Sequence, residues 1–371
     1  MTPNPASRRP DAAGRASLRQ LASGATRVPL LDAKGQLTEP LILVDLDAPA
    51  DPVLLAEARD AAQEDEHILV GVRTGEPPGE RWHDLLGALD LTLTRPGLQE
   101  TRPSVGLPDP AAAARALHAT ANARPQACLT LVQVLRASAG LDVRSALNVE
   151  SFAYSTLLGG AEFRRWLDGR PARPARPVPP PGPEPAVIIE RDAGSLLITL
   201  NRPARRNAYS RELRDALVNA LLVPALDDTV TRVVITGAGP SFCSGGDLDE
   251  FGTAPDLATA HFVRSSGGAA ALLHRIADRA EVRVHGSCVG AGIELPAFAG
   301  RVTARPGTTF RLPEVGMGLI PGAGGTVSIA RRIGPWRTLY LALSGSPLDA
   351  DAAVRWGLVD HLAGPAAGLA D

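Results

Sequence analysis

The chain has 371 residues, of which 44% are hydrophobic, and its formal net charge is -2. This length exceeds one comfortable hydrophobic core and predicts two domains or somewhat more. The near-neutral charge, without a long block of like charges, gives no reason to expect a nucleic-acid or membrane-surface partner. No run approaches about eighteen apolar residues, so no membrane-spanning helix is expected.

Three cysteines, Cys128, Cys243 and Cys288, lack metal-ligand spacing and are odd in number. They favour a reducing compartment, so we expect a cytoplasmic protein without a metal site, with Cys243 and Cys288 as small core residues. The N-terminus has no hydrophobic signal core. Its arginines and serines would suit a transit peptide, but Asp11 and the prolines favour a disordered tail, which we place at residues 1–37.

Two subregions follow the tail. In residues 38–105, short apolar or alternating runs at 41–46, 67–72 and 89–94 are separated by helical patterns, which predicts small αβ units. Residues 106–170 carry apolar residues at spacings of three and four, which predicts helices. The proline-dominated stretch PARPARPVPPPGPEP, residues 171–185, cannot form a helix or a central strand and predicts a linker.

Strands and helices alternate after the linker. Residues 187–201 predict two strands with a turn at 192–194, residues 211–226 an amphipathic helix, and residues 231–239 a buried strand that ends in glycines. The order strand, helix, strand then repeats. Such alternation predicts an α/β fold whose sheet is mainly parallel, with helical crossovers.

Three glycine-rich loops each follow a predicted strand. They are SFCSGGDL (241–248), VGAGIEL (289–295) and LPEVGMGLIPGAGG (312–325). Glycine lets backbone N–H groups approach a ligand closely, and a helix N-terminus leaves N–H donors unpaired. Two such turns that face one cavity would hold an oxyanion.

Two carboxylates stand in these apolar loops. If a helix begins near Gly290, the N–H of Ala291 is free and Glu294 lies on the same helix face. Glu314 follows twenty residues later, at a turn after a strand at 309–311. The pair would converge on a water molecule. The alternatives are that Glu294 complements a helix dipole and that Glu314 pairs with an arginine.

Five segments together resemble the ordered signature blocks of the enoyl-CoA hydratase/isomerase, or crotonase, superfamily. They are NRPARRNA (201–208), SFCSGGDL, GAGIEL, LPEVGMGLIPGAGG and SGSPLDADAAVRWGLVD (344–360). The resemblance covers residues 187–363, with the blocks in the usual order and spacing, and as a set it is highly specific. It implies a crotonase-like ββα spiral core at residues 186–366.

The resemblance also implies roles for individual residues. In the family, the backbone N–H groups that match Gly246 and Ala291 polarise the thioester carbonyl. The two glutamates of hydratases match Glu294 and Glu314. By this analogy Glu314 donates a proton to the α-carbon, and Glu294 orients and activates the water.

The coenzyme A arm would by analogy lie along five residues of the first three blocks, namely Ala208, Ser244, Gly245, Asp247 and Gly290. Asp247 also suits a helix cap. The resemblance implies no metal, flavin or redox cofactor, since coenzyme A is part of the substrate. It implies a homo-oligomer, a trimer or hexamer.

Two features depart from the family pattern. Family members continue for some sixty residues of helices beyond the last block, whereas this sequence stops at Asp371 and residues 110–170 resemble those helices instead. We therefore expect these N-terminal helices to dock on the core, in the same chain or a neighbouring one. Residues 38–105 resemble a degenerate first half of the same fold. Arg283 indicates either a locally exposed strand or an altered pocket.

The function that the resemblance implies is enoyl-CoA hydratase, a lyase of fatty acid metabolism. Two alternatives stay open. One is another crotonase-type reaction on an acyl-CoA, such as isomerisation, thioester hydrolysis or a step of secondary metabolism. The other is a noncatalytic acyl-CoA-binding or scaffold subunit.

Overall fold

The computed structural model describes residues 14–76, 79–97, 103–171 and 184–364. Most of the predicted linker, residues 172–183, therefore lies outside the described residues. The chain divides into two compact units, one made of residues 1–133 with 334–344 and the other of residues 134–333 with 345–371. No helix within the described ranges is both long and apolar enough to cross a membrane.

The first unit is built on a five-stranded sheet whose strands are all parallel and follow chain order. Its strands are β1 (Arg15–Ser17), β2 (Leu41–Asp45), β3 (Ile68–Val72), β4 (Leu91–Thr94) and β5 (Ser104–Gly106). Every residue of β3 and β4 is buried, because helices cover both faces of the sheet. The predicted strands at 41–46, 67–72 and 89–94 are confirmed.

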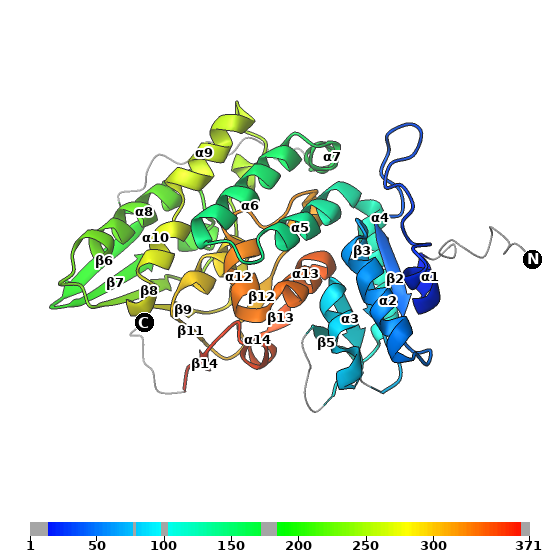
Figure 1. Cartoon of the computed structure of the whole chain (residues 1–371). Coiled ribbons are helices and arrows are strands. Elements are labelled where there is room, and N and C mark those ends of the chain that lie inside the picture. The colour runs from blue at the N-terminus through cyan, green and yellow to red at the C-terminus, as the bar shows by residue number, and fades with distance from the viewer. Residues whose placement is uncertain (1–13, 77–78, 98–102, 172–183, 365–371) are drawn as a thin grey trace, which may run out of the picture. The chain divides into compact units, whose positions relative to one another are not determined.

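Short helices pack on the two faces of this sheet. They are α1 (Leu18–Ala22), α2 (Pro52–Gln63), the 3₁₀ turn η2 (Glu80–Trp82), α3 (His83–Ala88), α4 (Pro110–Ala123) and α13 (Pro335–Ser344). Helices α1, α2 and α3 share one apolar cluster with Ile42, Val44 and Leu69, and Figure 1 shows them beside the strands. Helix α4 lies against β2, β3 and β4, and α13 contacts α4, β4 and β5.

Two sequence-based boundaries are wrong in this unit. The expected disordered tail, residues 1–37, contains β1 and α1, because Leu18 and Leu21 are buried and Ser17 forms a capping box with Gln20. Helix α13 was expected in the crotonase-like core but belongs to the first unit. Its buried side chains complete the apolar layer beside α4. The likeness of residues 38–105 to a half-crotonase stays a prediction.

The second unit has a six-stranded sheet in the order β14-β11-β9-β8-β7-β6. Only the hairpin β6–β7 is antiparallel, and the other neighbours are parallel, as the strand-helix alternation predicts. The strands are β6 (Val187–Asp192), β7 (Ser195–Leu200), β8 (Arg232–Gly237), β9 (Ala280–Val284), β11 (Arg301–Ala304) and β14 (His361–Leu362).

A second, three-stranded sheet in this unit consists of β10 (Ser287–Val289), β12 (Thr309–Arg311) and β13 (Leu348–Asp349). The helices are α6 (Val143–Leu158), α7 (Ala161–Asp168), α8 (Arg211–Leu226), α9 (Leu257–Gly267), α10 (Ala270–Arg275), α11 (Ala291–Glu294), α12 (Gly325–Ile333) and α14 (Ala350–Trp356), and the 3₁₀ turns are η3 (Pro203–Arg205), η4 (Leu248–Glu250), η5 (Ala277–Arg279), η6 (Pro296–Phe298) and η7 (Glu314–Met317). Helix α5 (Pro125–Ala137) contains the boundary between the two units. The α/β class is confirmed.

Helices α6 and α7 dock on the second unit within one chain, as the sequence predicts. The hydroxyl of Ser155 donates to the carbonyl of Leu257 at 2.9 Å, and Arg170 donates to the carbonyl of Leu248 at 2.8 Å. Trp166 of α7 packs edge-on against Phe251 with ring centroids 5.9 Å apart. Helix α4 does not take part, because its apolar face is used by the first unit.

Candidate active site

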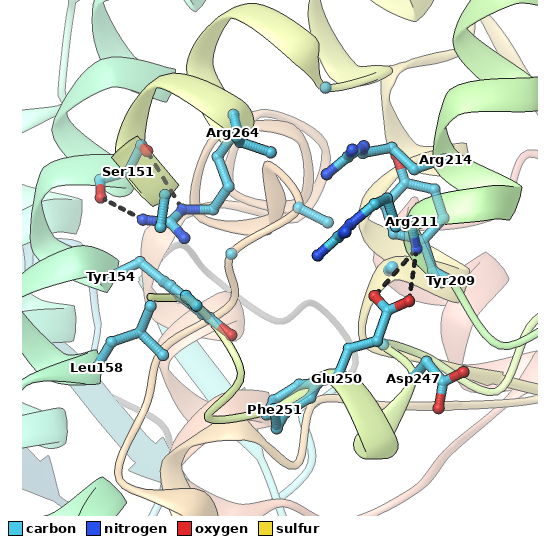
Figure 2. Close-up of a pocket in the computed structure, with 18 of the residues that line it drawn as sticks. Ser151, Tyr154, Leu158, Tyr209, Arg211, Arg214, Asp247, Glu250, Phe251 and Arg264 are labelled. Atoms are coloured by element: carbon cyan, nitrogen blue, oxygen red, sulfur yellow. Dashed lines mark hydrogen bonds between the residues drawn. The ribbon is translucent and has the colours of Figure 1, made fainter. Parts of the chain in front are cut away.

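A cavity of 550 Å³ opens in the second unit, with walls formed by α6, α9 and α11, the start of α8 and the loop before α12 (Figure 2). The predicted catalytic and oxyanion residues Gly246, Ala291, Glu294 and Glu314 all line it. The structure therefore brings together four residues that lie in three different loops of the sequence. Arg283 does not line this cavity. It pairs with Glu281 on β9 and is partly buried there, so Arg283 does not alter this pocket.

The backbone N–H groups of Gly246 and Ala291 are available at this cavity. Among the described residues, neither N–H donates a hydrogen bond. The two loops are tied together where the N–H of Val289 donates to the carbonyl of Cys243 at 3.1 Å. A Cβ at Gly292 would lie 2.2 Å from that same carbonyl oxygen, so only glycine permits this close approach.

Glu294 and Glu314 both lie close to Gly290. A Cβ built on Gly290 would lie 2.4 Å from Oε1 of Glu314 and 3.5 Å from Oε1 of Glu294. Gly290 has φ of 50° and ψ of -120°, and its N–H donates to the carbonyl of Arg311 at 2.9 Å. The positive φ turns the chain sharply from β10 into α11, and the missing side chain leaves room for both carboxylates.

Glu294 is held by the start of α12. Its Oε2 accepts hydrogen bonds from the N–H groups of Ala323 at 2.7 Å and Gly325 at 2.9 Å. These are donors that a helix N-terminus leaves without partners inside the helix. The alternative that Glu294 merely complements the dipole of its own helix is wrong, because α11 has four residues and the carboxylate caps a different helix.

Glu314 has no arginine partner. Its Oε2 is buried without a hydrogen-bond partner among the described residues, and no ion pair involves it there. Burial is the main reason that the pKa of Glu314 rises to about 8, and Arg311 opposes the rise. Burial together with Glu314 and Glu150 also raises the pKa of Glu294 well above its usual range.

Glu150 is a third buried carboxylate at the cavity. It comes from α6 and accepts from the N–H groups of Gly324 at 2.7 Å and Thr326 at 2.9 Å, and from the hydroxyl of Thr326 at 2.6 Å. Burial raises its pKa to about 7, against these hydrogen bonds. The sequence showed Glu150 as part of a helix that resembles a family segment, but gave it no place at the site.

The cavity wall also contains Tyr154 and Arg264, which sequence reasoning missed. The Arg264 guanidinium lies over the Tyr154 ring, 4.7 Å from its centroid. Burial raises the pKa of Tyr154, and the three glutamates add to this rise. The hydroxyl of Tyr154 points into the cavity (Figure 2). No sequence pattern connected Tyr154 with Arg264, because their helices, α6 and α9, are about a hundred residues apart in the chain.

The predicted coenzyme A residues have mixed positions. Asp247 lines the cavity, and as expected it caps a short helical turn, η4, while also pairing with Arg205 at 2.8 Å. Ala208, Ser244 and Gly245 are not among the lining residues, although Ala208 directly precedes Tyr209 and Gly245 directly precedes Gly246, which are. The N–H of Ser244 is already used by the carbonyl of Arg206 at 3.0 Å. Arg211 and Arg214 of α8 also line this side and were not anticipated.

The two cysteines predicted as core residues do not line the cavity. Cys243 and Cys288 are 2% and 0% exposed, and burial raises the pKa of both thiols, so they are core residues as expected.

Two backbone donors and two buried carboxylates that line one cavity define a site suited to polarising a carbonyl group and moving protons beside it. The family model for enoyl-CoA hydratase/isomerase matches residues 190–369. The 2,3-dehydroadipyl-CoA hydratase of Escherichia coli (strain K12) is 37% identical over 176 residues, which cover 47% of this chain and 68% of that protein. The chain therefore belongs to the enoyl-CoA hydratase/isomerase, or crotonase, family.

Another relative is named for a different reaction. The 1,2-epoxyphenylacetyl-CoA isomerase of Escherichia coli (strain K12) is 34% identical over 178 residues, covering 47% of this chain and 68% of that protein. A solved carnitinyl-CoA dehydratase from Mycobacterium avium 104 is 34% identical, covers 49% of this chain and 72% of that chain, and has a TM-score of 0.44. Family membership identifies an enzyme superfamily and leaves the particular reaction open.

Proposed function

We propose that this protein is an enoyl-CoA hydratase, a lyase that adds water across the 2,3 double bond of a 2-enoyl-CoA thioester. The observation that carries the proposal is that Glu294 and Glu314 both approach the position of the missing Cβ of Gly290 and line one cavity. The same cavity is lined by Gly246 and Ala291, whose N–H groups donate to no other described residue. Hydration needs these two functions at once, a charge sink at the carbonyl oxygen and acid-base groups at the adjacent double bond.

The thioester oxygen would lie between the N–H groups of Gly246 and Ala291. Negative charge develops on this oxygen as water attacks the β-carbon, and preformed donors stabilise that charge without reorganising. Losing one such donor typically costs about 2.7–4 kcal/mol of activation free energy. These two N–H groups support this role because they have no acceptor among the described residues, and an N–H group without an acceptor costs free energy where water is excluded.

The proton before reaction would reside on Glu314. Burial raises the pKa of both glutamates, but two N–H donors at the start of α12 favour the ionised form of Glu294, whereas Oε2 of Glu314 has no donor among the described residues. Ionised Glu294 then takes a proton from water as the hydroxyl oxygen bonds to the β-carbon. Neutral Glu314 donates its proton to the α-carbon. A proton passing from Glu294 to Glu314 restores the starting state, so one water is consumed for each product.

The coenzyme A arm would lie on the side of the cavity that holds Asp247, close to Ala208, Ser244 and Gly245. Gly290 would contribute only space, because its N–H is already bonded to Arg311. The proposed reaction needs no metal or redox cofactor. A cytoplasmic homo-oligomer, as a trimer or hexamer, remains part of the proposal.

The test is turnover of a panel of 2-enoyl-CoA thioesters, followed by loss of the conjugated absorbance. We expect Glu294→Gln and Glu314→Gln each to lower kcat by about 10²- to 10⁴-fold, because each removes one acid-base group while preserving side-chain size. Glu190→Gln is the matched control, since Glu190 is exposed on β6 and away from the cavity. Its activity should equal that of the wild type.

Other outcomes point to the alternatives. Near-normal hydration by both glutamine variants contradicts the assignment. Conversion of a 3-enoyl-CoA to a 2-enoyl-CoA without water addition indicates an isomerase, and release of free coenzyme A thiol indicates a hydrolase. Binding of acyl-CoA without turnover of any thioester indicates the noncatalytic subunit.

A further inference from the structure

Arg264 places a permanent positive charge in the wall of the cavity. It comes from α9, is half-buried, and lies with Tyr154 on the side opposite Arg211 and Arg214 (Figure 2). A guanidinium remains charged in proteins, and a charge removed from water is costly unless a partner compensates it. The identity of its partners therefore shows what the site is prepared to bind.

The partners of Arg264 inside the protein are neutral. Its Nε donates to the hydroxyl of Ser151 at 3.3 Å, and its Nη2 donates to the carbonyl of Ser151 at 3.3 Å and to the hydroxyl of Ser155. The ring of Tyr154 covers one face. Within the described ranges, no carboxylate forms an ion pair with Arg264, and its Nη1 donates no hydrogen bond.

The nearest acidic influence, Glu150, does not neutralise Arg264. The charge of Glu150 affects the pKa of Arg264, but the two side chains form no ion pair among the described residues. Both oxygens of Glu150 instead accept hydrogen bonds from the start of α12. Ser151, Ser155 and Tyr154 instead hold the guanidinium plane in one orientation. These contacts use Nε and Nη2, so the N–H groups of Nη1 are the ones left to donate to an anionic oxygen such as that of a carboxylate.

The location of Arg264 in the cavity wall indicates which part of a substrate it meets. Arg264 and Tyr154 lie on one side of the cavity, and Arg211, Glu250 and Asp247 lie on the other (Figure 2). The proposed coenzyme A residues belong to the side of Asp247, so Arg264 faces the acyl end.

We propose that Arg264 selects acyl-CoA thioesters whose acyl chain ends in a carboxylate. This substrate class rests on the proposed function, because it uses the same cavity and the same orientation of the thioester. Arg264 binds the distal carboxylate through Nη1, and Tyr154 adds a hydroxyl donor on the same wall. A methyl-ended chain of equal length leaves the guanidinium charge without an anion.

The experiment compares two 2-enoyl-CoA thioesters of equal chain length, one ending in a carboxylate and the other in a methyl group. We expect the wild type to favour the carboxylate-ended thioester in kcat/KM. Arg264→Met should lower that value by roughly 10- to 100-fold and leave the methyl-ended thioester within about threefold. Arg264→Lys keeps the charge but loses the planar guanidinium group. Its kcat/KM for the carboxylate-ended thioester should lie between the values of the wild type and of Arg264→Met.

Arg355→Met is the matched control, because Arg355 is exposed on α14 and does not line the cavity. It should preserve the preference of the wild type. An equal loss for both thioesters in Arg264→Met would mean that Arg264 only links α6 to α9, and that result overturns the proposal. A wild-type preference for the methyl-ended thioester overturns it as well.

A binding measurement separates this proposal from the proposed hydration. Calorimetric Kd values for two saturated acyl-CoA thioesters, carboxylate-ended and methyl-ended, need no turnover. If the wild type hydrates nothing yet its Kd ratio collapses in Arg264→Met, the hydratase assignment fails and the substrate class stands. If hydration proceeds and the Kd ratio is unchanged by Arg264→Met, the substrate class fails alone.

Discussion

Gly290 leaves room for the Glu294 and Glu314 carboxylates because it has no side chain. Its φ of 50° lies in the region that favours glycine, and the space that a Cβ would occupy is taken by Oε1 of Glu314. The sequence placed Gly290 at the start of a helix and Glu294 on its first turn, and both are confirmed. The approach of Glu314 could not be seen there, because it depends on how β12 pairs with β10.

Gly290→Ala should lower kcat by at least about tenfold, because a Cβ 2.4 Å from Oε1 of Glu314 forces that carboxylate to move. Gly307→Ala is the matched control. Gly307 also has a positive φ, of 79°, but an added Cβ meets nothing within 4 Å. Both variants should lose about 1–2 kcal/mol of unfolding free energy from backbone strain. Equal kcat in the two variants would contradict a role for the space at Gly290.

The start of α12 is an element that three parts of the chain create together. Helix α12 supplies the N–H donors, α11 supplies Glu294, and α6 supplies Glu150. The sequence predicted α6 as a helix that docks on the core, and this is confirmed. It could not assign Glu150 to α12, because the two residue groups are separated by about 170 positions and only tertiary packing brings them into contact.

Glu150→Gln should destabilise the second unit, because one carboxylate oxygen that accepts an N–H becomes an amide nitrogen that cannot. We expect a loss of about 1–3 kcal/mol in the free energy of unfolding, measured by denaturant titration. Amide exchange at Gly324 and Thr326 should accelerate more than exchange in β8. Glu190→Gln on the exposed strand β6 of the same unit is a comparison for the chemistry of the substitution alone. Unchanged exchange at both amides would refute the capping role.

At the scale of the whole molecule, the two compact units do not follow the order of the sequence. Helix α13 lies between two segments of the second unit in the chain, yet it packs with α4, β4 and β5. Conversely, α6 and α7 precede the proline-rich stretch and belong with the catalytic unit. A division of the chain into consecutive segments therefore assigns these helices to the wrong unit.

Leu339→Ala in α13 should reveal this arrangement. Leu339 is 1% exposed, and removing a buried leucine side chain typically costs about 2–5 kcal/mol. Hydrogen exchange should accelerate in α4, β4 and β5 of the first unit. Leu221→Ala in α8, whose leucine is 0% exposed, should instead accelerate exchange in the second unit. Faster exchange of β8 and β9 in Leu339→Ala, with no effect on β4, would contradict the placement of α13.

The sequence by itself determined the α/β class, most strands and helices, and the family, because periodicity and glycine-rich loops are local properties of the chain. It also identified the four loop residues that meet at the cavity. The tertiary structure decided which side chains complete the cavity wall, namely Glu150, Tyr154 and Arg264. Their positions follow from packing between α6, α9 and α12, and contacts between helices distant in sequence leave no spacing pattern in the chain.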